Sequence, residues 1–339
     1  MKLYSNETVF PGHPDKVCDQ ISAAILDECL KQDPFTRAGI ECAGGKGILF
    51  ITGEVATKAH VDVKEIAAGI LKDMGYPEME IIVNISRQSE DIALGVDVGG
   101  AGDNGMMFGY ACNDTEEKLP LAMVILQKFA RGYDALRRED SRFRSDGKAQ
   151  ITGIYDDDFK LTRIKDFTIC YQNDEQHREE TDEILRTMAL RICGSYGIEV
   201  ETFYINPTGK FELGGFAADA GLTGRKIVVD SYQSFANVGG GCMNGKDPTK
   251  VDVSGAYMAR VFACELLEKE DLQWCEVQLS YAIGIDRPLA IYVDSDKGNL
   301  EAPEEFYDRA RPNNIIKELD LRAPSWRSRA MFGHFTGAC

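Results

Sequence analysis

The sequence contains no long hydrophobic run. Its longest apolar stretch, residues 121–126, is far shorter than the ~20 residues that a helix needs to cross a bilayer. The first residues, Met1 to Glu7, also lack the apolar core of a secretory signal peptide. We therefore expect a cytoplasmic protein with no membrane partner.

Positive charge is also in short supply. The chain has 38 Lys and Arg residues against 55 Asp and Glu residues, a net charge of −17. A surface for nucleic acid or for an anionic membrane requires a long-range positive potential. The composition therefore argues against both kinds of partner, and a bound phosphate would need a local group of cations.

The sequence also lacks the closely spaced cysteine pairs that bind zinc or form redox disulfides. The chain has ten cysteines, yet no two of them form a Cys-x-x-Cys motif. Cys18, Cys29, Cys170, Cys193 and Cys264 lie among apolar residues. This pattern predicts small core residues in a reducing compartment, without a zinc site and without disulfides.

Several common catalytic motifs are absent too. There is no Gly-x-Ser-x-Gly elbow, no His-Glu-x-x-His helix and no kinase pair of His-Arg-Asp and Asp-Phe-Gly. The usual serine hydrolases, zinc proteases and protein kinases are therefore excluded.

What the sequence does contain is typical of a globular protein. With 339 residues, 44% of them apolar, the chain is long enough for two or three domains at about 150 residues each. The predicted strands cover 46–55, 79–85, 150–155, 161–171, 200–205, 276–283 and 289–293, and the predicted helices begin at Pro14 and cover 61–74, 120–138, 181–196 and 303–319. Strands followed by a helix recur three times, which suggests three related α/β units with helices on one face of each sheet.

Two segments lack apolar periodicity. Residues 88–105 are rich in Gly and Asp, so we expect a mobile surface loop there. Residues 206–252 alternate glycine with charge, and so long an irregular stretch in a compact domain usually has a functional reason. We expect the ligand to bind there.

Two glycine-rich motifs fit known phosphate-binding patterns only in part. Residues 240–247 have P-loop spacing, but Asp247 stands where Ser or Thr should be, and Pro248 breaks any helix that would follow. Residues 100–105 match the dinucleotide fingerprint, but a strand follows where a helix is required. A turn whose backbone amides face phosphate and a plain surface turn both remain open at 240–247.

Five cations, Lys210, Arg225, Lys226, Lys246 and Lys250, gather in this otherwise acidic chain. Together they suit a polyphosphate pocket, although each one alone could be a solvated surface group.

Carboxylates accompany the cations. His13 and Asp15 stand at a predicted helix start, where backbone amides favour an anion and a carboxylate beside phosphate implies Mg²⁺. The alternative makes Asp15 a helix cap and His13 a surface residue. Glu41 and Glu54 flank a strand and could be solvated, bind a cation or clamp an ammonium group.

Six segments carry a resemblance to a known family. They are GHPDK at 12–16, GDNGMMFGYA at 102–111, FYINPTG at 203–209, GLTGRK at 221–226, GGG at 239–241 with GKDP at 245–248, and SYAIG at 280–284. In this order they resemble the S-adenosylmethionine synthetase family over nearly the whole chain. The resemblance implies three similar α/β domains about a pseudo-threefold axis, at about 1–98, 99–213 and 214–339, with the chain crossing between domains.

The resemblance also implies an activity. The sulfur of L-methionine attacks C5′ of ATP, giving S-adenosylmethionine and triphosphate, which is then hydrolysed to pyrophosphate and phosphate. A thioether sulfur carries no proton, so the first step needs no general base. The resemblance further implies two Mg²⁺ per site, K⁺, and a homodimer with shared active sites that can pair into a dimer of dimers.

Site residues follow by position from the same resemblance. The catalytic residues are His13, Lys148, Arg225, Lys226 and Lys246. The ATP-binding residues are His13, Asp146, Lys148, Lys210, Phe211, Asp219, Arg225, Lys226, Cys242 and Lys246. The methionine-binding residues are Glu54, Gln88, Asp103, Asp219 and Lys250. Asp15 and Asp252 match the Mg²⁺ ligands, and Glu41 matches the K⁺ site.

The chain departs from the family pattern in a few places. Lys210 replaces an Arg, which keeps the charge but loses the planar fork. Cys242 and Asn104 replace Ala and Gln, and the loop at 88–100, which matches one that closes over the site, is shorter than usual.

Overall fold

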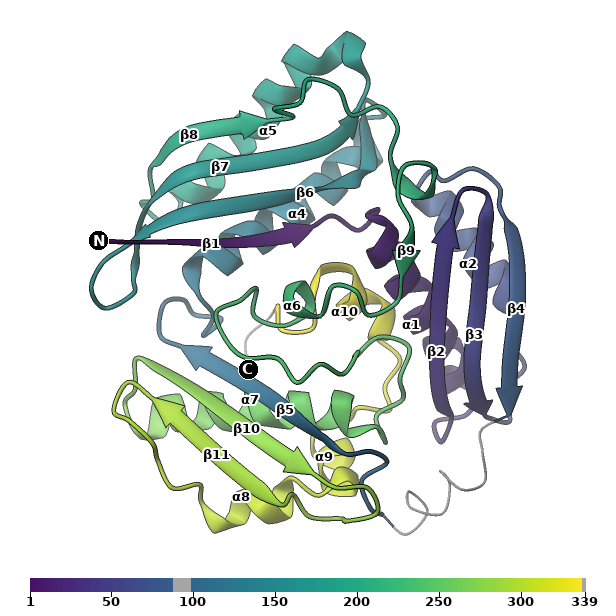
Figure 1. Ribbon diagram of the computed structural model, residues 1–339, viewed down its shortest axis with the longest axis vertical. Helices are drawn as coiled ribbons and strands as arrows, with labels where there is room; N and C mark the ends of the chain where they lie inside the picture. The colour runs from purple at the N-terminus through teal and green to yellow at the C-terminus, as the bar shows by residue number, and fades with distance from the viewer. Residues whose placement is uncertain (88–98, 337–339) are drawn as a thin grey trace.

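Three β-sheets surround the centre of the molecule in the computed structural model, which describes residues 1–87 and 99–336 (Figure 1). The strand orders are β1-β6-β7-β8, β11-β10-β5 and β4-β3-β2-β9. The strands are β1 (Lys2–Val9), β2 (Arg37–Gly45), β3 (Ile48–Ala56), β4 (Glu80–Arg87), β5 (Gly105–Cys112), β6 (Phe143–Tyr155), β7 (Leu161–Asn173), β8 (Val200–Ile205), β9 (Gly221–Leu222), β10 (Trp274–Tyr281) and β11 (Ala290–Ser295). The helices are α1 (Pro14–Gln32), α2 (Val63–Asp73), α4 (Leu121–Glu139), α5 (Arg178–Gly194), α6 (Ile227–Asp230), α7 (Val251–Lys269), α8 (Glu304–Arg309), α9 (Pro312–Glu318) and α10 (Trp326–Phe332). The expected α/β organisation in three units is therefore present.

The chain crosses between these units. β1 pairs antiparallel with β6, with Val9 opposite Lys148, and β5 pairs antiparallel with β10. Each of these two sheets thus combines strands from distant parts of the sequence. The contiguous ranges 1–98, 99–213 and 214–339 stay a prediction.

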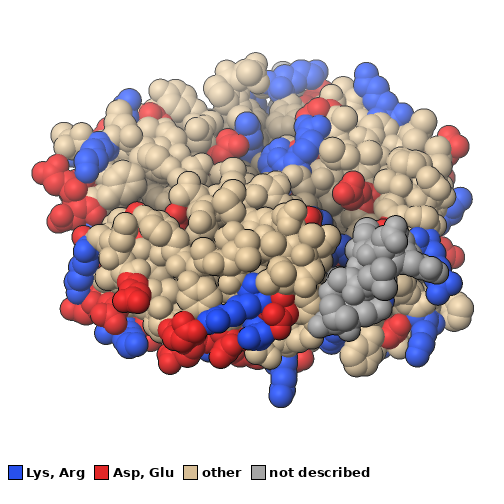
Figure 2. Space-filling model, turned by 60° about the horizontal axis from the view of Figure 1, so that its bottom comes forward, with Lys and Arg blue, Asp and Glu red and all other residues tan. Residues whose placement is uncertain are grey.

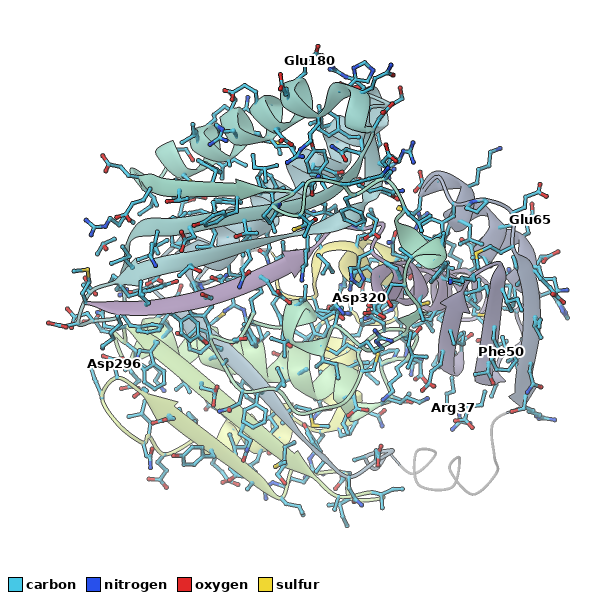
Figure 3. The ribbon with its side chains drawn as sticks, turned by 45° about the horizontal axis from the view of Figure 1, so that its top comes forward. Arg37, Phe50, Glu65, Glu180, Asp296 and Asp320 are labelled. Atoms are coloured by element: carbon cyan, nitrogen blue, oxygen red, sulfur yellow. The ribbon has the colours of Figure 1, made fainter. Side chains whose placement is uncertain are left out.

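Helices cover one face of each sheet. In β2, Ala38, Ile40 and Cys42 are buried, whereas the alternate residues point to the other face, as the two-residue period of a strand dictates. Phe50 of β3 lies on that uncovered face, while Glu65 belongs to the covering helix α2 (Figure 3). The uncovered faces are thereby left for ligands or partners.

Helix α7 lies close against the sheet of β5 and β10. A Cβ atom on Gly109 of β5 would come within 1.9 Å of the carbonyl carbon of Ala259. Only glycine allows the helix backbone to approach this closely. Because α7 begins directly after the 206–250 segment, this packing fixes one end of that segment.

The structure differs from several sequence-based expectations. Strands β1 and β2 and helix α7 were not predicted. The single helix expected at 303–319 is two helices, α8 and α9, because Pro312 forces Arg311 into an extended conformation (φ −66°, ψ 133°). The 206–252 segment is irregular as expected, except for β9, α6 and the start of α7.

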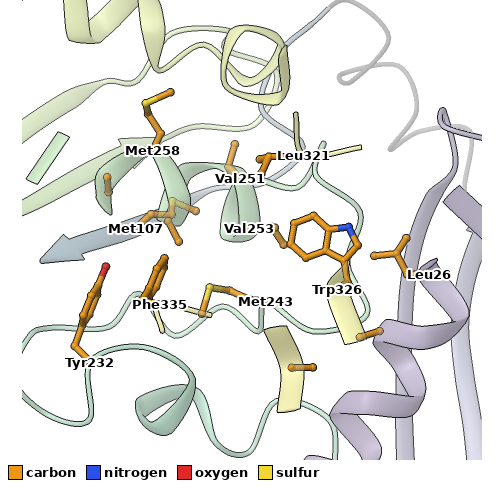
Figure 4. Packing of buried hydrophobic residues seen from close by; sticks show 14 of the residues in the cluster. Leu26, Met107, Tyr232, Met243, Val251, Val253, Met258, Leu321, Trp326 and Phe335 are labelled. Carbon is orange, nitrogen blue, oxygen red and sulfur yellow. The ribbon is translucent and has the colours of Figure 1, made fainter. Parts of the chain in front are cut away.

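The end of the described chain belongs to the core. Trp326 and Phe335 pack among Leu26, Met243 and Val251 (Figure 4). The ring of Phe335 stacks on Tyr232 with centroids 4.8 Å apart. The C-terminal segment therefore ties α1, α7 and the central segment together.

The expectation of reduced cysteines holds only in part. Eight cysteines of the described residues are free thiols, but Cys264 is disulfide-bonded, so that expectation was wrong for Cys264. In the described ranges, no helix combines the length and apolar character required to cross a membrane.

Candidate active site

The first group of site residues lies at the start of α1. Pro14 occupies the first turn, and the backbone N–H of Asp15 donates to Nδ1 of His13 at 3.2 Å. His13 is therefore the N-cap of the helix, which corrects the alternative that gave this part to Asp15. The carboxylate of Asp15, fully buried, is left to contact other segments.

Asp15 gathers two of the predicted cations. Its Oδ2 lies 2.5 Å from Nζ of Lys226, and its Oδ1 lies 3.2 Å from Nε of Arg225. The backbone N–H of Leu222 also donates to Oδ1 at 2.9 Å. Asp15 thus helps to hold the GLTGRK segment on the N-terminus of α1.

His13 is uncharged at neutral pH. Its burial, together with the charges of Lys226 and Lys148, lowers its pKa to about 4, against the opposing effect of Asp15 and Asp219. Since Nδ1 accepts from the Asp15 N–H, the ring proton belongs on Nε2. His13 can therefore donate one hydrogen bond into the site.

A second group lies around Gly39 of β2. Nζ of Lys246 lies 2.5 Å from Oδ2 of Asp252, and Lys250 donates to the carbonyl of Ala38 at 2.9 Å. The backbone of Gly39 forms an isolated antiparallel β-bridge with that of Lys246, and Gly39 pairs with Glu54 of β3 in the sheet. Nζ of Lys250 also lies 3.0 Å from Oδ2 of Asp247, so this group combines two lysines with three carboxylates.

Gly39 leaves room for these side chains. A Cβ atom at this position would lie 3.5 Å from Cε of Lys250 and 3.9 Å from Cγ of Glu54. An ammonium and a carboxylate thus flank the same stretch of bare backbone, which is the pair of charges that an amino acid requires.

Asp146 of β6 positions the segment that follows Phe211. Its Oδ2 accepts from the backbone N–H of Gly215 at 2.7 Å, and burial raises its pKa to about 6. The Phe211 carbonyl accepts from Asn173 N–H at 3.0 Å. Lys210 is exposed and pairs with Glu212 at 2.9 Å.

The remaining predicted residues are less tightly held. Lys148 of β6 and Asp219 are exposed, and both are close enough to His13 to shift its pKa. Cys242 packs against Gly224, whose Cβ would lie 2.9 Å from the Cys242 Cβ, and burial raises the pKa of its thiol to about 12.

Three predicted residues lie farther out or beyond the described chain. Asp103 is exposed and accepts from the backbone N–H of Asn104 at 2.7 Å. Glu41 is exposed on β2, opposite Thr52. Gln88 lies outside the described residues.

The carboxylates suit a metal ion only together with a substrate. Among residues 1–87 and 99–336 there is no group of three or more His, Cys, Asp or Glu side chains that could hold a metal ion. Asp15 and Asp252 are instead single carboxylates beside cations. Mg²⁺ commonly takes one or two carboxylates and completes its shell with phosphate oxygens and water, and these residues fit that arrangement.

Sequence reasoning missed a set of buried polar residues beneath both groups. They are Lys16, Asp19, Asp230, Asn244 and His334. The sequence held one signal: Lys16 and Asp19 are three positions apart, which brings a lysine and a carboxylate together on one face of a helix. Their burial, among the 16 buried residues of α1, is visible only in the structure.

Comparison with known proteins agrees with this geometry. Family models for the N-terminal, central and C-terminal domains of S-adenosylmethionine synthetase match residues 1–94, 98–211 and 213–338. The chain belongs to the S-adenosylmethionine synthetase family. The expected family and enzyme class, methionine adenosyltransferase, are thereby confirmed.

Curated relatives carry the same name. The S-adenosylmethionine synthases of Finegoldia magna and Clostridium tetani are each 40% identical to this chain, and the matches cover 98% of it. They also cover 93% and 94% of those two proteins. The similarity to the synthetase family thus extends through all three units.

Proposed function

We propose that the protein transfers the adenosyl group of ATP to the sulfur of L-methionine by displacement at C5′, and then hydrolyses the triphosphate to pyrophosphate and phosphate. The observation that carries the proposal is the pairing of Arg225 and Lys226 with Asp15 and of Lys246 with Asp252. In a chain of net charge −17, these cations gather where a polyphosphate needs them.

The first step requires alignment and charge neutralisation. Methionine sulfur has no proton to lose, so the barrier falls when sulfur, carbon and leaving oxygen are held in line and the charge on the triphosphate is stabilised. Arg225, Lys226 and Lys246 would donate hydrogen bonds to the phosphate oxygens. Mg²⁺ at Asp15 and Asp252, two per site, would add neutralisation of the triphosphate.

Neutral His13 supplies a hydrogen bond to the leaving oxygen. Its Nε2–H is the only ring donor once Nδ1 accepts from Asp15 N–H. A donor that needs no protonation keeps this contact through the neutral pH range. Lys148, on the neighbouring strand β6, adds positive charge on the same side.

Methionine fits the second group. Glu54 would hold its ammonium group and Lys250 its carboxylate, because the two side chains flank Gly39. Gln88, Asp103 and Asp219 complete the proposed methionine site. The proposed adenosine and phosphate contacts further include Asp146, Lys210, Phe211 and Cys242, and Glu41 is proposed to bind K⁺.

Self-association would complete the site. The uncovered sheet faces expose Ile82 of β4 at 41%, Met106 of β5 at 50% and Tyr292 of β11 at 48%, and such apolar faces are typical of protein interfaces. We propose a homodimer whose active sites are shared between subunits and which can pair again into a dimer of dimers.

Nucleic acid is not a proposed partner. On the face shown in Figure 2, Lys and Arg side chains alternate with Asp and Glu around a broad uncharged area, without a continuous basic surface in its described part. A cytoplasmic location also remains a prediction.

The test is direct. The protein is incubated with ATP, L-methionine, Mg²⁺ and K⁺, and S-adenosylmethionine, pyrophosphate and phosphate are quantified together. Equal amounts of all three, dependent on methionine, support the proposal. ADP would indicate a kinase-like reaction, and tight ATP binding without turnover would indicate a nucleotide sensor.

A further inference from the structure

A fully buried ammonium group lies beneath the two groups of site residues. The side chain of Lys16 is 1% exposed and contacts Asp19 at 3.0 Å. It also contacts Asp230, which is almost as deeply buried. Burial alone would lower the pKa of Lys16, but the two carboxylates raise it. By their contacts the three groups form an ion triad between α1 and α6.

One arm of the triad reaches the GLTGRK segment. Oδ1 of Asp19 accepts from the backbone N–H of Gly224 at 2.9 Å. Gly224 has a φ of +81°, a conformation that glycine adopts at little cost. The next two residues are Arg225 and Lys226, so this bond fixes where both cations leave the backbone.

The other arm reaches the loop that carries Lys246. Oδ2 of Asp230 accepts from Nδ2 of Asn244 at 2.8 Å. Gly245, between Asn244 and Lys246, accepts from the Ile40 N–H at 2.9 Å. Asn244 and β2 therefore hold this loop from two sides.

The C-terminal segment closes the network. Nε2 of His334 lies 2.8 Å from Oδ1 of Asn244. The backbone N–H of His334 donates to the Asp230 carbonyl at 2.8 Å. Nδ1 of His334 lies 2.8 Å from the Tyr257 hydroxyl. Phe335, beside Tyr232 in Figure 4, anchors this segment in the core.

We propose that Lys16 and Asn244 are positioning residues, which set the spacing between the Arg225–Lys226 pair and Lys246 and hence the fit of both to one triphosphate. A buried ion triad contributes little net stability, because desolvation offsets the attraction of its charges. The triad instead links two loops. The loop at Gly224 and the loop at Asn244, 20 residues apart along the chain, each bond to a carboxylate that contacts the same Lys16 ammonium group. Cations that bind one polyphosphate depend on such spacing, since small misplacements of a charged donor reduce rates strongly.

The inference rests on the proposed function, so its test uses a ligand that needs no turnover. Binding of inorganic tripolyphosphate is measured by calorimetry alongside kcat and the two KM values. Asn244→Ala cuts one arm without unbalancing the triad. We expect it to weaken tripolyphosphate binding about tenfold and to lower kcat, while the KM for methionine stays within about twofold.

A second variant tests Lys16. Lys16→Met alone leaves two buried carboxylates without their cation, so it is combined with Asp19→Asn and Asp230→Asn, which keeps the interior neutral. We expect the same loss of tripolyphosphate affinity with a cooperative thermal transition retained. Lys31→Met is the matched control, because Lys31 is an exposed lysine of the same helix paired with Glu28.

Two results would overturn the inference. One is wild-type tripolyphosphate affinity and kcat in Asn244→Ala with only a lower melting temperature, which is what a purely structural role predicts. The other is an equal loss in Lys31→Met. If the wild-type protein binds tripolyphosphate but forms no S-adenosylmethionine, the proposed function fails and the positioning experiment can still be interpreted.

Discussion

Asp15 and Asp252 are both proposed to hold Mg²⁺, yet the structure surrounds them differently. Asp15 is fully buried, forms ion pairs with Lys226 and Arg225, and accepts a hydrogen bond from a backbone N–H. Asp252 is 12% exposed in its side chain and contacts Lys246 from the first turn of α7. The same chemical group is therefore fully buried in one half of the site and partly open to solvent in the other.

The difference separates folding from chemistry. Asp15 connects α1 to the GLTGRK segment, so its negative charge supports the fold as well as the proposed metal. Asp252 also stands in the first turn of a helix, where the N-terminus favours a carboxylate, but among the described residues its ion-pair partner is the single cation Lys246. Substitutions at the two positions should therefore differ in stability more than in activity.

The largest effect is expected from Asp15→Asn. The change removes the negative charge of a fully buried side chain that Lys226, Arg225 and the Leu222 N–H contact, and the loss of these contacts costs about 2 kcal/mol of unfolding free energy, because the two cations keep some access to water. We also expect kcat/KM to fall on the order of a hundredfold or more. Urea unfolding and steady-state kinetics measure the two effects, and near-normal turnover at ordinary Mg²⁺ concentrations would refute the ligand assignment.

Asp252→Asn should reduce activity without the same loss of stability. We expect kcat to fall on the order of a hundredfold, whereas the unfolding free energy changes by less than about 1 kcal/mol because this pair is nearer to solvent. The measurements are those used for Asp15→Asn. Equal destabilisation by the two substitutions would break the comparison.

The sequence predicted some features of the site and missed others. Short motifs were enough to name His13 and the charged residues Asp15, Arg225, Lys226 and Lys246, because charge and glycine leave a clear local pattern. The structure brings them together in two groups, as a phosphate site requires. The motif alone could not show that His13, not Asp15, caps the helix.

Long-range contacts were harder to predict. Strand β1 pairs with β6, which lies more than 130 residues away along the chain, and no local pattern specifies that pairing. Helix α7 was missed because buried residues surround it, so it lacks the amphipathic period that identifies a surface helix. The contact of His334 with Asn244 likewise joins segments 90 residues apart.

The Asp15 half should also contribute a pH dependence through His13. His13 has a folded pKa of about 4 against 6.5 for an ordinary His, so between these values the unfolded chain binds a proton that the folded chain does not. Stability must then fall as the pH decreases through this window, by about 1.4 kcal/mol per pH unit. The effect is absent above the unfolded pKa.

His13→Asn tests this dependence, because Asn is also a good N-cap and keeps the helix start intact. We expect the wild type to lose about 2 kcal/mol more than the variant between pH 6.5 and pH 5 in urea unfolding. Parallel stability curves for the two proteins over this range would show that His13 is not held neutral by the fold.

The smallest effect is expected at Lys210, whose pair with Glu212 is exposed at 63% and 38%. If burial sets how much each pair contributes to stability, Lys210→Arg should change the unfolding free energy by less than about 0.5 kcal/mol. The planar guanidinium can still contact phosphate in a bidentate way, so the KM for ATP should decrease by up to about threefold. A large change in stability with an unchanged KM would show that exposure does not decide which charges of this site support the fold, and the contrast between Asp15 and Asp252 would then need another cause.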